Sequence, residues 1–430
     1  MSQRFVRARA LHFPELTCSG FDYSEDAVLH IENGYIKRFA PARSFFSDGL
    51  EPDVCEHYPN MLLMPGLIDA HVHFPQVEII ASFGDQLLDW LEHYTFPAEA
   101  KFADQQYARA AAAEFIELLV AHGTTTAFTY ATSHCHSADA LFEAAFARSM
   151  RLVAGKVLMD RNAPENILDT VATGQADSEY LIKKWHGQGR LGYAVTPRFA
   201  GTSSDQQLQS AAELFARYPD TWVQTHLAEN LAELAWLQSI VDDFKDYFSI
   251  YEQAGLATQR SVFGHCIHLS DRELSRLKET GGIAAFCPSS NLFLGSGLFP
   301  LQAIRGEGIP VAIGTDVGAG TSLSMLSTLG DAYRVCQLQN FALDPLEAFY
   351  MATLGNAHAL HLSDRIGNFC AGKEADFILL NPARNALVAK RIKTSKHIRD
   401  ELFCYMMMGD DRLVEQTTLL GDIQFQRGAG

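Results

Sequence analysis

The chain has 430 residues, which is enough for two ordinary domains or for one large barrel with an appendage. Hydrophobic residues make up 47% of it and charged residues 20%, and no low-complexity tract interrupts them, so a largely disordered protein is excluded. The 51 acidic residues outnumber the 34 Lys and Arg residues. The resulting net charge of −17 disfavours a nucleic-acid partner, although a neutral free base can still enter a pocket.

The beginning of the chain contains Arg4, Arg7 and Arg9, but no apolar stretch of the length that a signal peptide needs follows them. Nowhere do about 18 apolar residues run uninterrupted, so no transmembrane helix is expected. The eight cysteines are scattered without a C-x-x-C pair or a short framework spacing, which is typical of reduced thiols. The sequence therefore predicts a soluble, cytoplasmic protein without a membrane partner.

Short strands separated by turns are predicted for about the first sixty residues. In AVLHIENGYIKRF, the pair Asn33-Gly34 between two alternating apolar runs indicates a hairpin. The tail after about Ile366 has a similar pattern, with EADFILLNP as a compact strand. We expect these two ends to differ in architecture from the segment between them.

From Met64 to about Leu362, short β-rich runs alternate with helical stretches, which predicts βα units and a parallel sheet. About eight such units over roughly three hundred residues favour a closed (β/α)8 barrel, an α/β fold, over an open doubly wound sheet. No GxGxxG or GxxxxGK[ST] motif occurs, so a nucleotide-phosphate loop has no local support.

Two histidines stand one residue apart at the end of the run MPGLIDAHVHFPQ. His71 and His73 project to the same side of an extended chain, as two imidazoles must if they are to reach one ion. Alone, H-x-H is a weak motif, and two ordinary histidines on a strand explain it as well. The same spacing recurs at His134 and His136, but this second pair follows its strand by several residues and is not expected to bind metal.

Later strand ends carry further polar residues. His226 ends TWVQTH, with Glu229 three residues on, His265 ends SVFGH, and Asp316 ends VAIGTD. Each has an ordinary explanation when taken singly, as a core histidine, a helix-start carboxylate or an N-cap. A barrel brings all strand ends to one rim, which makes these explanations improbable together. Three imidazoles and one carboxylate suit Zn²⁺ better than Fe²⁺, and metal binding lowers the pKa of a water towards about 7.

The motifs PGLIDAHVHFPQ, THLAE, GHC and GTDVGAG, in this order, resemble the amidohydrolase superfamily. The segments LLDWLEHYTFPAEAKFAD, GTTTAFTYAT, VTPRFA, CPSSNLFLGSG and IGNFCAGKEADFILLNP are similar to its guanine deaminase branch, and the similarity covers nearly the whole chain. The resemblance implies a barrel over 65–365 with one zinc per subunit, and a small β-sandwich built from 1–64 and 366–430. It also implies a homodimer and the conversion of guanine and water to xanthine and ammonia.

The resemblance also assigns roles to positions that match the family's motifs. The matched zinc ligands are His71, His73, His226 and Asp316. The matched catalytic residues are Glu229, His265 and Asp316. The residues expected at the substrate are Gln76, Arg198, Phe199, His73, His226, Glu229 and Asp316. Two departures concern pocket shape and substrate range: Phe286 precedes Cys-Pro where relatives commonly have histidine, and Ala200-Gly201 follows TPRF in place of Ser or Ala with Pro.

Our hypothesis for the reaction is attack of an activated water on C2 of guanine. Asp316, which the metal holds ionised beforehand, accepts a proton from the water, and His265 orients the water by a hydrogen bond. Glu229 protonates ring N3 and then helps to deliver a proton to the leaving amine. Arg198 has only donors and fits the O6 carbonyl, whereas Gln76 offers a donor and an acceptor to a ring edge. Adenine presents an amine where guanine presents the O6 carbonyl. A buried Arg198 that faces this donor costs about 1–3 kcal/mol, so we expect guanine to be preferred over adenine at least tenfold.

Other enzymes of the superfamily remain alternatives, because deaminases or chlorohydrolases acting on 8-oxoguanine, cytosine or an aminotriazine share the metal site. A dihydropyrimidinase-like enzyme is disfavoured, since LGYAVTPRFA lacks the bridging lysine. A cytidine-deaminase type of zinc site is unsupported, because no P-C-x-x-C follows an H-x-E. A catalytically silent relative that acts as a binding protein is disfavoured, because every ligand and acid–base position carries a competent residue.

Overall fold

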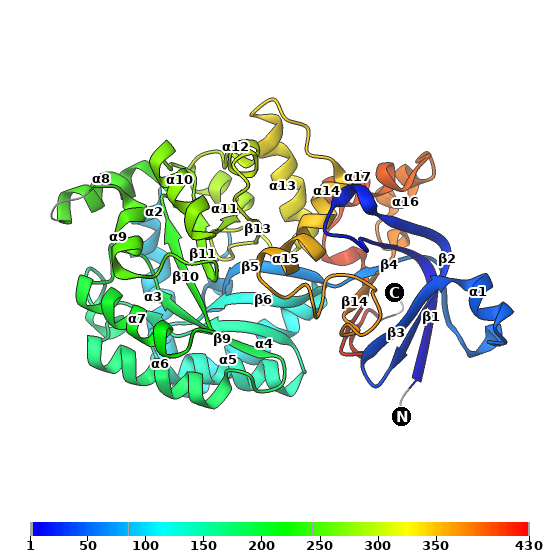
Figure 1. The fold of residues 1–430 in the computed structure, drawn as a ribbon, viewed down its shortest axis with the longest axis horizontal. Coiled ribbons are helices and arrows are strands. Elements are labelled where there is room, and N and C mark those ends of the chain that lie inside the picture. Colours follow the sequence, from blue (N-terminus) through cyan, green and yellow to red (C-terminus); the bar gives the residue numbers. More distant parts are fainter. Residues whose placement is uncertain (1–2, 85, 242–244, 429–430) are drawn as a thin grey trace.

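The computed structural model describes residues 3–84, 86–241 and 245–428, with a barrel at one end of the molecule and a separate sheet at the other (Figure 1). The barrel strands are parallel and follow the order β13-β12-β11-β10-β9-β7-β6-β5, with the short β8 (Val157–Leu158) paired to β9. Their bounds are β5 (Leu67–His73), β6 (Thr124–Tyr130), β7 (Arg151–Gly155), β9 (Leu191–Pro197), β10 (Trp222–Leu227), β11 (Ser261–His265), β12 (Ile283–Phe286) and β13 (Val311–Ile313). The expected α/β barrel is confirmed.

The barrel strands are buried on both faces, which explains why they are almost continuous runs of apolar residues and threonine. Side chains that point into the barrel form a core of their own, which includes Ile68, Phe128, Val153, Val262 and Ile283. Side chains of the opposite face join the larger core beneath the surrounding helices. The barrel interior is thus packed, and the strand ends are left to form a site.

The barrel is nearly closed at the seam between β13 and β5. At the carboxyl end of the seam, the Asp316 N–H donates to the His71 carbonyl at 2.7 Å. Further down, the Asn356 side chain accepts from the Ile313 N–H and donates to the carbonyls of Ile313 and Ile68, each at 2.8 Å. The seam therefore brings the end of the last strand beside the paired histidines of the first.

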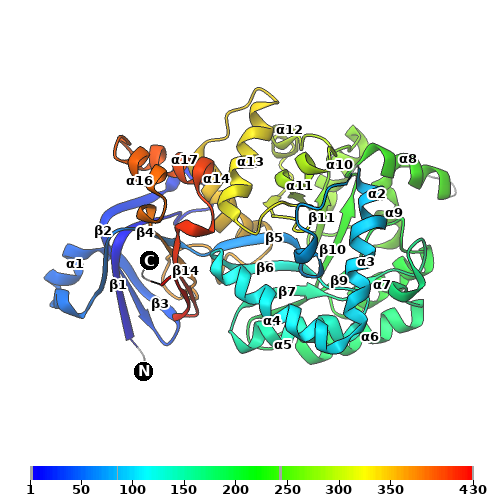
Figure 2. The same cartoon turned by 180° about the vertical axis from the view of Figure 1, so that it is seen from behind.

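Helices surround the barrel and cover the outer face of its strands (Figures 1 and 2). Many begin at a side-chain cap, as α4 does at Asp104 and α10 at Ser270. The bounds are α4 (Gln105–Ala121), α5 (Cys135–Ala147), α6 (Val171–Trp185), α7 (Asp205–Arg217), α8 (Leu231–Ile240), α9 (Tyr247–Ala254), α10 (Asp271–Thr280), α11 (Pro288–Phe293), α12 (Leu301–Gly306), α13 (Met325–Gln337), α14 (Pro345–Tyr350) and α15 (Asn356–Ala359). Within the described residues, none of the helices is both long enough and apolar enough to span a bilayer.

Both ends of the chain meet in one seven-stranded mixed sheet of order β16-β15-β14-β4-β1-β2-β3. The strand β4 of the first segment pairs with β14 of the tail, and the β2–β3 hairpin turns at Asn33 and Gly34, both with positive φ. The expected contribution of both chain ends is confirmed, but their strands form one mixed sheet where a β-sandwich was expected, and the bounds 1–64 and 366–430 stay a prediction. The bounds are β1 (Gln3–His12), β2 (Asp22–Glu32), β3 (Tyr35–Pro41), β4 (Glu56–Pro65), β14 (Phe377–Leu380), β15 (Val414–Leu419) and β16 (Asp422–Gln426), with helices α1 (Ala42–Ser47), α16 (Ala386–Ile392) and α17 (Ile398–Met408).

A helical segment after β5 lies on the side of the barrel away from the seven-stranded sheet (Figure 2). It comprises α2 (Leu87–Trp90), the π-helical η4 (Leu91–Thr95) and α3 (Phe96–Ala100). Pro97 has no N–H for a regular helical bond, and the wider π turn ends two residues before it, at Thr95. The segment contributes the apolar side chains of Leu87, Trp90 and Leu91 to the strand-end cavity, and its Glu99 is buried behind the cavity wall.

Candidate active site

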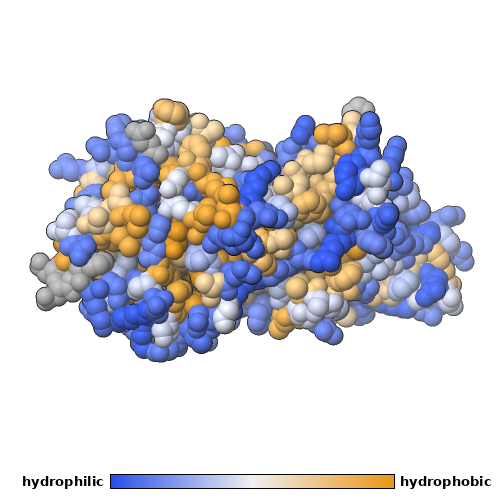
Figure 3. Space-filling model, turned by 90° about the horizontal axis from the view of Figure 1, so that it is seen from above, coloured by the Kyte–Doolittle hydropathy of each residue, from blue (hydrophilic) through white to orange (hydrophobic). Residues whose placement is uncertain are grey.

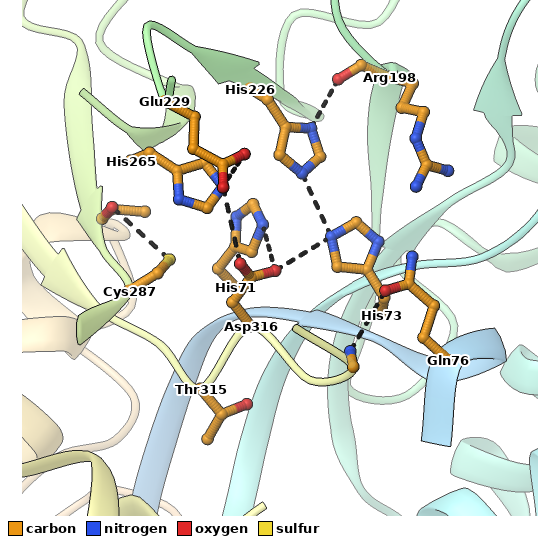
Figure 4. A network of polar contacts seen from close by, with 12 residues as sticks. His71, His73, Gln76, Arg198, His226, Glu229, His265, Cys287, Thr315 and Asp316 are labelled. Atoms are coloured by element: carbon orange, nitrogen blue, oxygen red, sulfur yellow. Dashed lines mark hydrogen bonds and ion pairs between the residues drawn. The ribbon is translucent and has the colours of Figure 1, made fainter. Parts of the chain in front are cut away.

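Four residues from separate parts of the barrel rim converge on one point (Figure 4). His71 and His73 come from β5, His226 from β10, and Asp316 from the loop after β13. One nitrogen or oxygen of each lies within 4.8 Å of the others. Nε2 of His71 and Nε2 of His73 are each 3.3 Å from Asp316 Oδ1, and Nε2 of His73 and His226 are 3.2 Å apart. All four predicted ligands are thus in one cluster.

The cluster has the chemistry of a metal-binding site. His71 and His73 are buried, and Nε2 of His71, which faces Asp316 Oδ1 at 3.3 Å, makes no hydrogen bond to any described residue. Leaving such a polar atom unsatisfied costs about 1–3 kcal/mol, whereas a cation between the imidazoles gives its lone pair a partner. Three imidazoles and one carboxylate suit a divalent ion such as zinc.

Neighbouring groups hold the cluster residues in place. Nδ1 of His226 lies 2.7 Å from the Arg198 carbonyl and donates to it, which leaves the Nε2 lone pair directed into the cluster. Asp69 accepts from the backbone N–H groups of His71 and Thr315 at 3.2 Å and 3.0 Å, and from the Thr315 hydroxyl. Asp69 thus supports the strand end and is not part of the four-residue cluster.

Two glycines next to the site leave room for His71. A Cβ on Gly264 would stand 2.6 Å from Cε1 of the His71 ring, and a Cβ on Gly314 would stand 2.6 Å from the His71 backbone nitrogen. Beyond these glycines, His265 and Asp316 adopt the left-handed conformation, with φ of 73° and 51°. Such strain in residues other than glycine is common at functional sites and aims these side chains into the cavity.

His265 stands between two carboxylates. Its Nε2 is 3.3 Å from Glu229 Oε2 and 3.7 Å from Asp316 Oδ2. Burial lowers the pKa of His265 to about 3, so the ring is neutral. Its Nδ1 accepts from Nδ2 of Asn291 at 2.8 Å, so the single ring proton is on Nε2 and points at the two carboxylates.

The two carboxylates have opposite pKa shifts. Burial raises the pKa of Glu229 well above its ordinary value, and the charges of Asp316 and Glu233 raise it further, so Glu229 is protonated. Burial also acts to raise the pKa of Asp316, but the imidazoles of His71, His73 and His265 hold it well below its ordinary value. One acid is thus available to donate a proton while the other is ionised and can accept one.

A cavity opens next to the cluster. Polar groups line its inner end, and leucine and aromatic side chains line much of the rest, as is typical of a small-molecule pocket. The lining residues are His73, Gln76, Leu87, Trp90, Leu91, Arg198, Phe199, His226, Glu229, Glu233, His265, Leu294, Asp316 and Ala319. Every residue predicted to face the substrate is among them.

Three polar residues at the site were not found by sequence reasoning. Asn291 orients His265, and Glu233 accepts from the backbone N–H groups of Glu229 and Asn230 at 3.0 Å and 3.3 Å. Glu99, in α3, is buried against the polar wall of the cavity. The spacing Asn230-x-x-Glu233 is that of a capping box and could have identified Glu233. Asn291 and Glu99 depend on contacts between distant segments, which sequence spacing does not reveal.

The two departures from the family pattern have structural explanations. Phe286 stacks on Phe299, with ring centroids 4.5 Å apart, in the core under the helices. A Cβ on Gly201 would stand 2.3 Å from the Trp236 ring and 2.5 Å from the Phe199 ring. Gly201 therefore allows Trp236 to pack beside Phe199, with centroids 5.9 Å apart, which supports a wall of the cavity.

The second H-x-H pair, His134 and His136, lies in contacts of a different kind from those of the first. The rings of His134 and His136 are stacked, and Nε2 of His136 lies 2.7 Å from the Phe102 carbonyl. In the part of the chain that the structure describes, neither residue belongs to a cluster of metal-ligating groups. Cys287 does form such a group with His265 and Asp316, but burial raises the pKa of its thiol well above the ordinary value, so it stays protonated.

Comparisons with known proteins agree with this geometry. The model of the Amidohydrolase family matches residues 62–404. The guanine deaminase of Escherichia coli (strain K12) is 46% identical over 419 residues, which cover 97% of this chain and 95% of that protein. The solved structure of E. coli guanine deaminase has a TM-score of 0.96 at 44% identity and covers 99% of this chain and 100% of that one. A structure of guanine deaminase from C. acetobutylicum with bound guanine in the active site has a TM-score of 0.89 at 28% identity, covering 99% and 100%.

Proposed function

The chain belongs to the guanine deaminases of the amidohydrolase family, and on this premise we propose that it hydrolyses guanine to xanthine and ammonia with one zinc ion per subunit. One observation carries the proposal. The four-residue cluster, two carboxylates of opposite protonation and the side chain of Arg198 all lie at one cavity. That combination suits water attack on a carbon of a neutral heterocycle that also carries a carbonyl.

The residues His71, His73, His226 and Asp316 would hold the ion. When bound, it supplies Lewis acidity that lowers the pKa of a water towards about 7 and makes a nucleophile available at neutral pH. The donor set of three imidazoles and one carboxylate favours zinc over the harder Mg²⁺ and Ca²⁺. Fe²⁺ ranks second after zinc.

Two residues act on the attacking water. Asp316 is ionised and takes a proton from the water as the bond to C2 forms. The neutral ring of His265 carries its proton on Nε2, and this N–H can hold the water by a hydrogen bond in the direction of attack. Because His265 is 1% exposed and fixed by Asn291, it does not need to reorganise during the reaction.

Glu229 acts on the leaving side of the base. It is protonated before the reaction and held by the Ser296 hydroxyl, which donates to Oε1 at 3.1 Å. It gives its proton to ring N3 as C2 is attacked. It then helps to pass the proton that Asp316 took from the water to the exocyclic amine, which leaves as ammonia, and regains a proton from the new C2 hydroxyl as the C2 carbonyl forms. The carboxylate formed in this way is beside the N–H of His265, 3.3 Å away, which stabilises its charge.

Recognition of the base is assigned to the opposite end of the cavity. Arg198 offers only donors and suits the O6 carbonyl, and the Gln76 amide can pair with a ring edge. Phe199 and the leucines of α2 and η4 offer apolar faces to the ring plane. Adenine would place an amine against Arg198, so we expect at least about tenfold discrimination in favour of guanine.

A panel of bases tests the proposal. Purified, zinc-loaded protein is mixed with guanine, adenine, cytosine, 8-oxoguanine and ammeline, and both ammonia release and the ultraviolet spectrum are followed. We expect the highest kcat/KM with guanine. Equal or faster turnover of another base would replace guanine as the substrate, and a protein that binds neither zinc nor iron and stays inactive after metal addition would contradict the enzymatic assignment.

We further propose a homodimer in the cytoplasm. The family resemblance supports the dimer, and so do large apolar side chains that are exposed in the single chain, such as Phe83 and Leu231 at 88% and 66%. From above, apolar surface gathers chiefly over the barrel half of the molecule (Figure 3). The eight cysteines are free thiols, which suits a reducing compartment. Light scattering coupled to gel filtration would measure the mass, and a monomeric mass at micromolar concentration would contradict the dimer.

A further inference from the structure

A buried carboxylate joins the two polar residues that are assigned to the base. Glu99 has no exposed surface, and both of its oxygens accept from Nη1 of Arg198, at 2.7 Å and 2.9 Å. One of them also accepts from Nε2 of Gln76 at 3.1 Å. Gln76 and Arg198 are each 3% exposed, so this triangle of side chains is almost entirely removed from solvent.

We propose that Glu99 is the positioning residue for substrate recognition: it fixes Arg198 and Gln76 in one orientation and cancels the charge of Arg198, so that the cavity accepts a neutral base with a carbonyl group. The inference rests on the proposed function, because it concerns how the same cavity selects guanine. Glu99 itself is not among the residues that line the cavity within the described chain, so it acts through its two partners.

The contacts of Arg198 determine which of its donors face the ligand. Nη1 is taken by Glu99, and the guanidinium lies over the Phe96 ring with its carbon 5.8 Å from the ring centroid. Phe96 and Glu99 are three residues apart on one helix face and hold the guanidinium from two directions. Nε and Nη2 are left as the donors for an acceptor such as a carbonyl oxygen.

The amide of Gln76 is fixed at both ends. Its Nε2 donates to the carboxylate of Glu99, which can only accept, and its Oε1 accepts from the N–H of Gly318 at 3.2 Å, which can only donate. The reverse orientation of the amide would place two acceptors together and two donors together. Gln76 therefore keeps one N–H and one lone pair for the ring edge, in known positions.

The charge of the wall follows from the same triangle. A lone buried arginine would attract an anion into the cavity and would be strongly unfavourable without one. With Glu99 beside it, the pair is neutral overall and still presents N–H donors. A neutral purine with a carbonyl can satisfy these donors without bringing a charge of its own, whereas an anionic ligand would also approach the carboxylate of Glu99.

The test uses the full-length, zinc-loaded enzyme with the variants Glu99→Gln, Arg198→Met and the double variant. The Gln substitution keeps the size of the side chain and removes its charge. We expect Glu99→Gln to lower kcat/KM for guanine at least about tenfold, mainly through KM, with unchanged zinc content. In the Arg198→Met background the same substitution should change kcat/KM less than about threefold, because most of its effect passes through Arg198 and only the contact with Gln76 remains.

A matched control is Glu374→Gln, which removes another buried carboxylate that pairs with Arg151 and Arg190 far from the cavity. It should lower the thermal midpoint yet leave KM for guanine unchanged. If Glu99→Gln does not fold, Glu99→Asp keeps the charge and should fold with a raised KM. Failure of the wild type to release ammonia from guanine would contradict the proposed function. A wild type that is active, together with an unchanged KM in Glu99→Gln or additive effects in the double variant, would overturn the role of Glu99 alone.

Discussion

Oε2 of Glu229 lies 3.3 Å from Nε2 of His265, and the proton on that nitrogen points towards the carboxyl group. Both side chains are buried, and neither belongs to the four-residue cluster His71, His73, His226 and Asp316. Their closeness places a protonated acid and a neutral hydrogen-bond donor side by side at the edge of the metal-binding site. The pair can therefore take part in proton transfer without taking part in metal binding.

The first prediction concerns Glu229→Gln. Because the residue lies outside the cluster, zinc content should stay near that of the wild type, while kcat falls by about 10²–10⁴ through loss of the proton donor. Metal analysis of the purified variant and steady-state kinetics with guanine measure the two effects. Loss of the metal would instead make Glu229 a part of the metal site and contradict its role as the acid.

The second prediction separates the two H-x-H pairs. His71→Ala should lose most of its bound metal and reduce activity by at least about two orders of magnitude, because a cluster ligand is gone. His134→Ala is the matched control, since it removes a histidine of the same spacing whose partner His136 bonds the Phe102 carbonyl. The control should keep its metal and its activity. Equal metal loss in both variants would contradict the assignment of the metal to the four-residue cluster.

The strand-end residues could be predicted from the sequence for a physical reason. Alternation along β5 places His71 and His73 on one side, and a parallel barrel collects His226, His265 and Asp316 at the same rim. The regular geometry of strands thus made the placement of these side chains predictable. The resemblance to a known family then separated ligands from acid–base residues, which spacing alone does not do.

The supporting contacts could not be predicted in this way. Glu99 and Arg198 are 99 positions apart, and their pairing depends on how the π-helical segment lies over the strand ends. Strand β4 pairs with β14 across about three hundred residues, so the order of the seven-stranded sheet depended on tertiary packing. Only coordinates show which distant side chains share a buried hydrogen bond.

The third prediction concerns the wall that Phe199 forms. Gly201→Ala should raise KM for guanine several-fold, because its Cβ would stand 2.3 Å from the Trp236 ring and push it and Phe199 apart. Trp236→Leu in the same chain should restore KM by making room. Gly306→Ala is the control, since a Cβ there meets nothing within 4 Å and should not change KM. An unaltered KM in Gly201→Ala would show that the wall tolerates the methyl group.

The fourth prediction concerns pH and Glu233, which accepts from the N–H of Glu229 and from the hydroxyl of Tyr247. Burial raises the pKa of Glu233 from 4.5 to about 7 in the folded protein. Between these values the unfolded chain releases the proton of Glu233 and the folded chain keeps it. The contribution of Glu233 to the free energy of unfolding therefore falls as pH rises from 4.5 to about 7. A pKa difference of this size corresponds to about 3 kcal/mol.

Glu233→Gln has no carboxyl group to titrate at this position. Its free energy of unfolding should therefore rise relative to that of the wild type over this pH range, and the difference should be complete above about pH 7. Thermal midpoints of both proteins, measured from pH 4.5 to 8, give the trend. Glu415→Gln should show the opposite sign, because Arg384 holds the pKa of Glu415 below its ordinary value, so that its contribution is present above that value and lost as pH falls. Parallel curves for the wild type and Glu233→Gln would mean that Glu233 is ionised in the folded protein. Its oxygens would then hold the Glu229 loop as a charged acceptor.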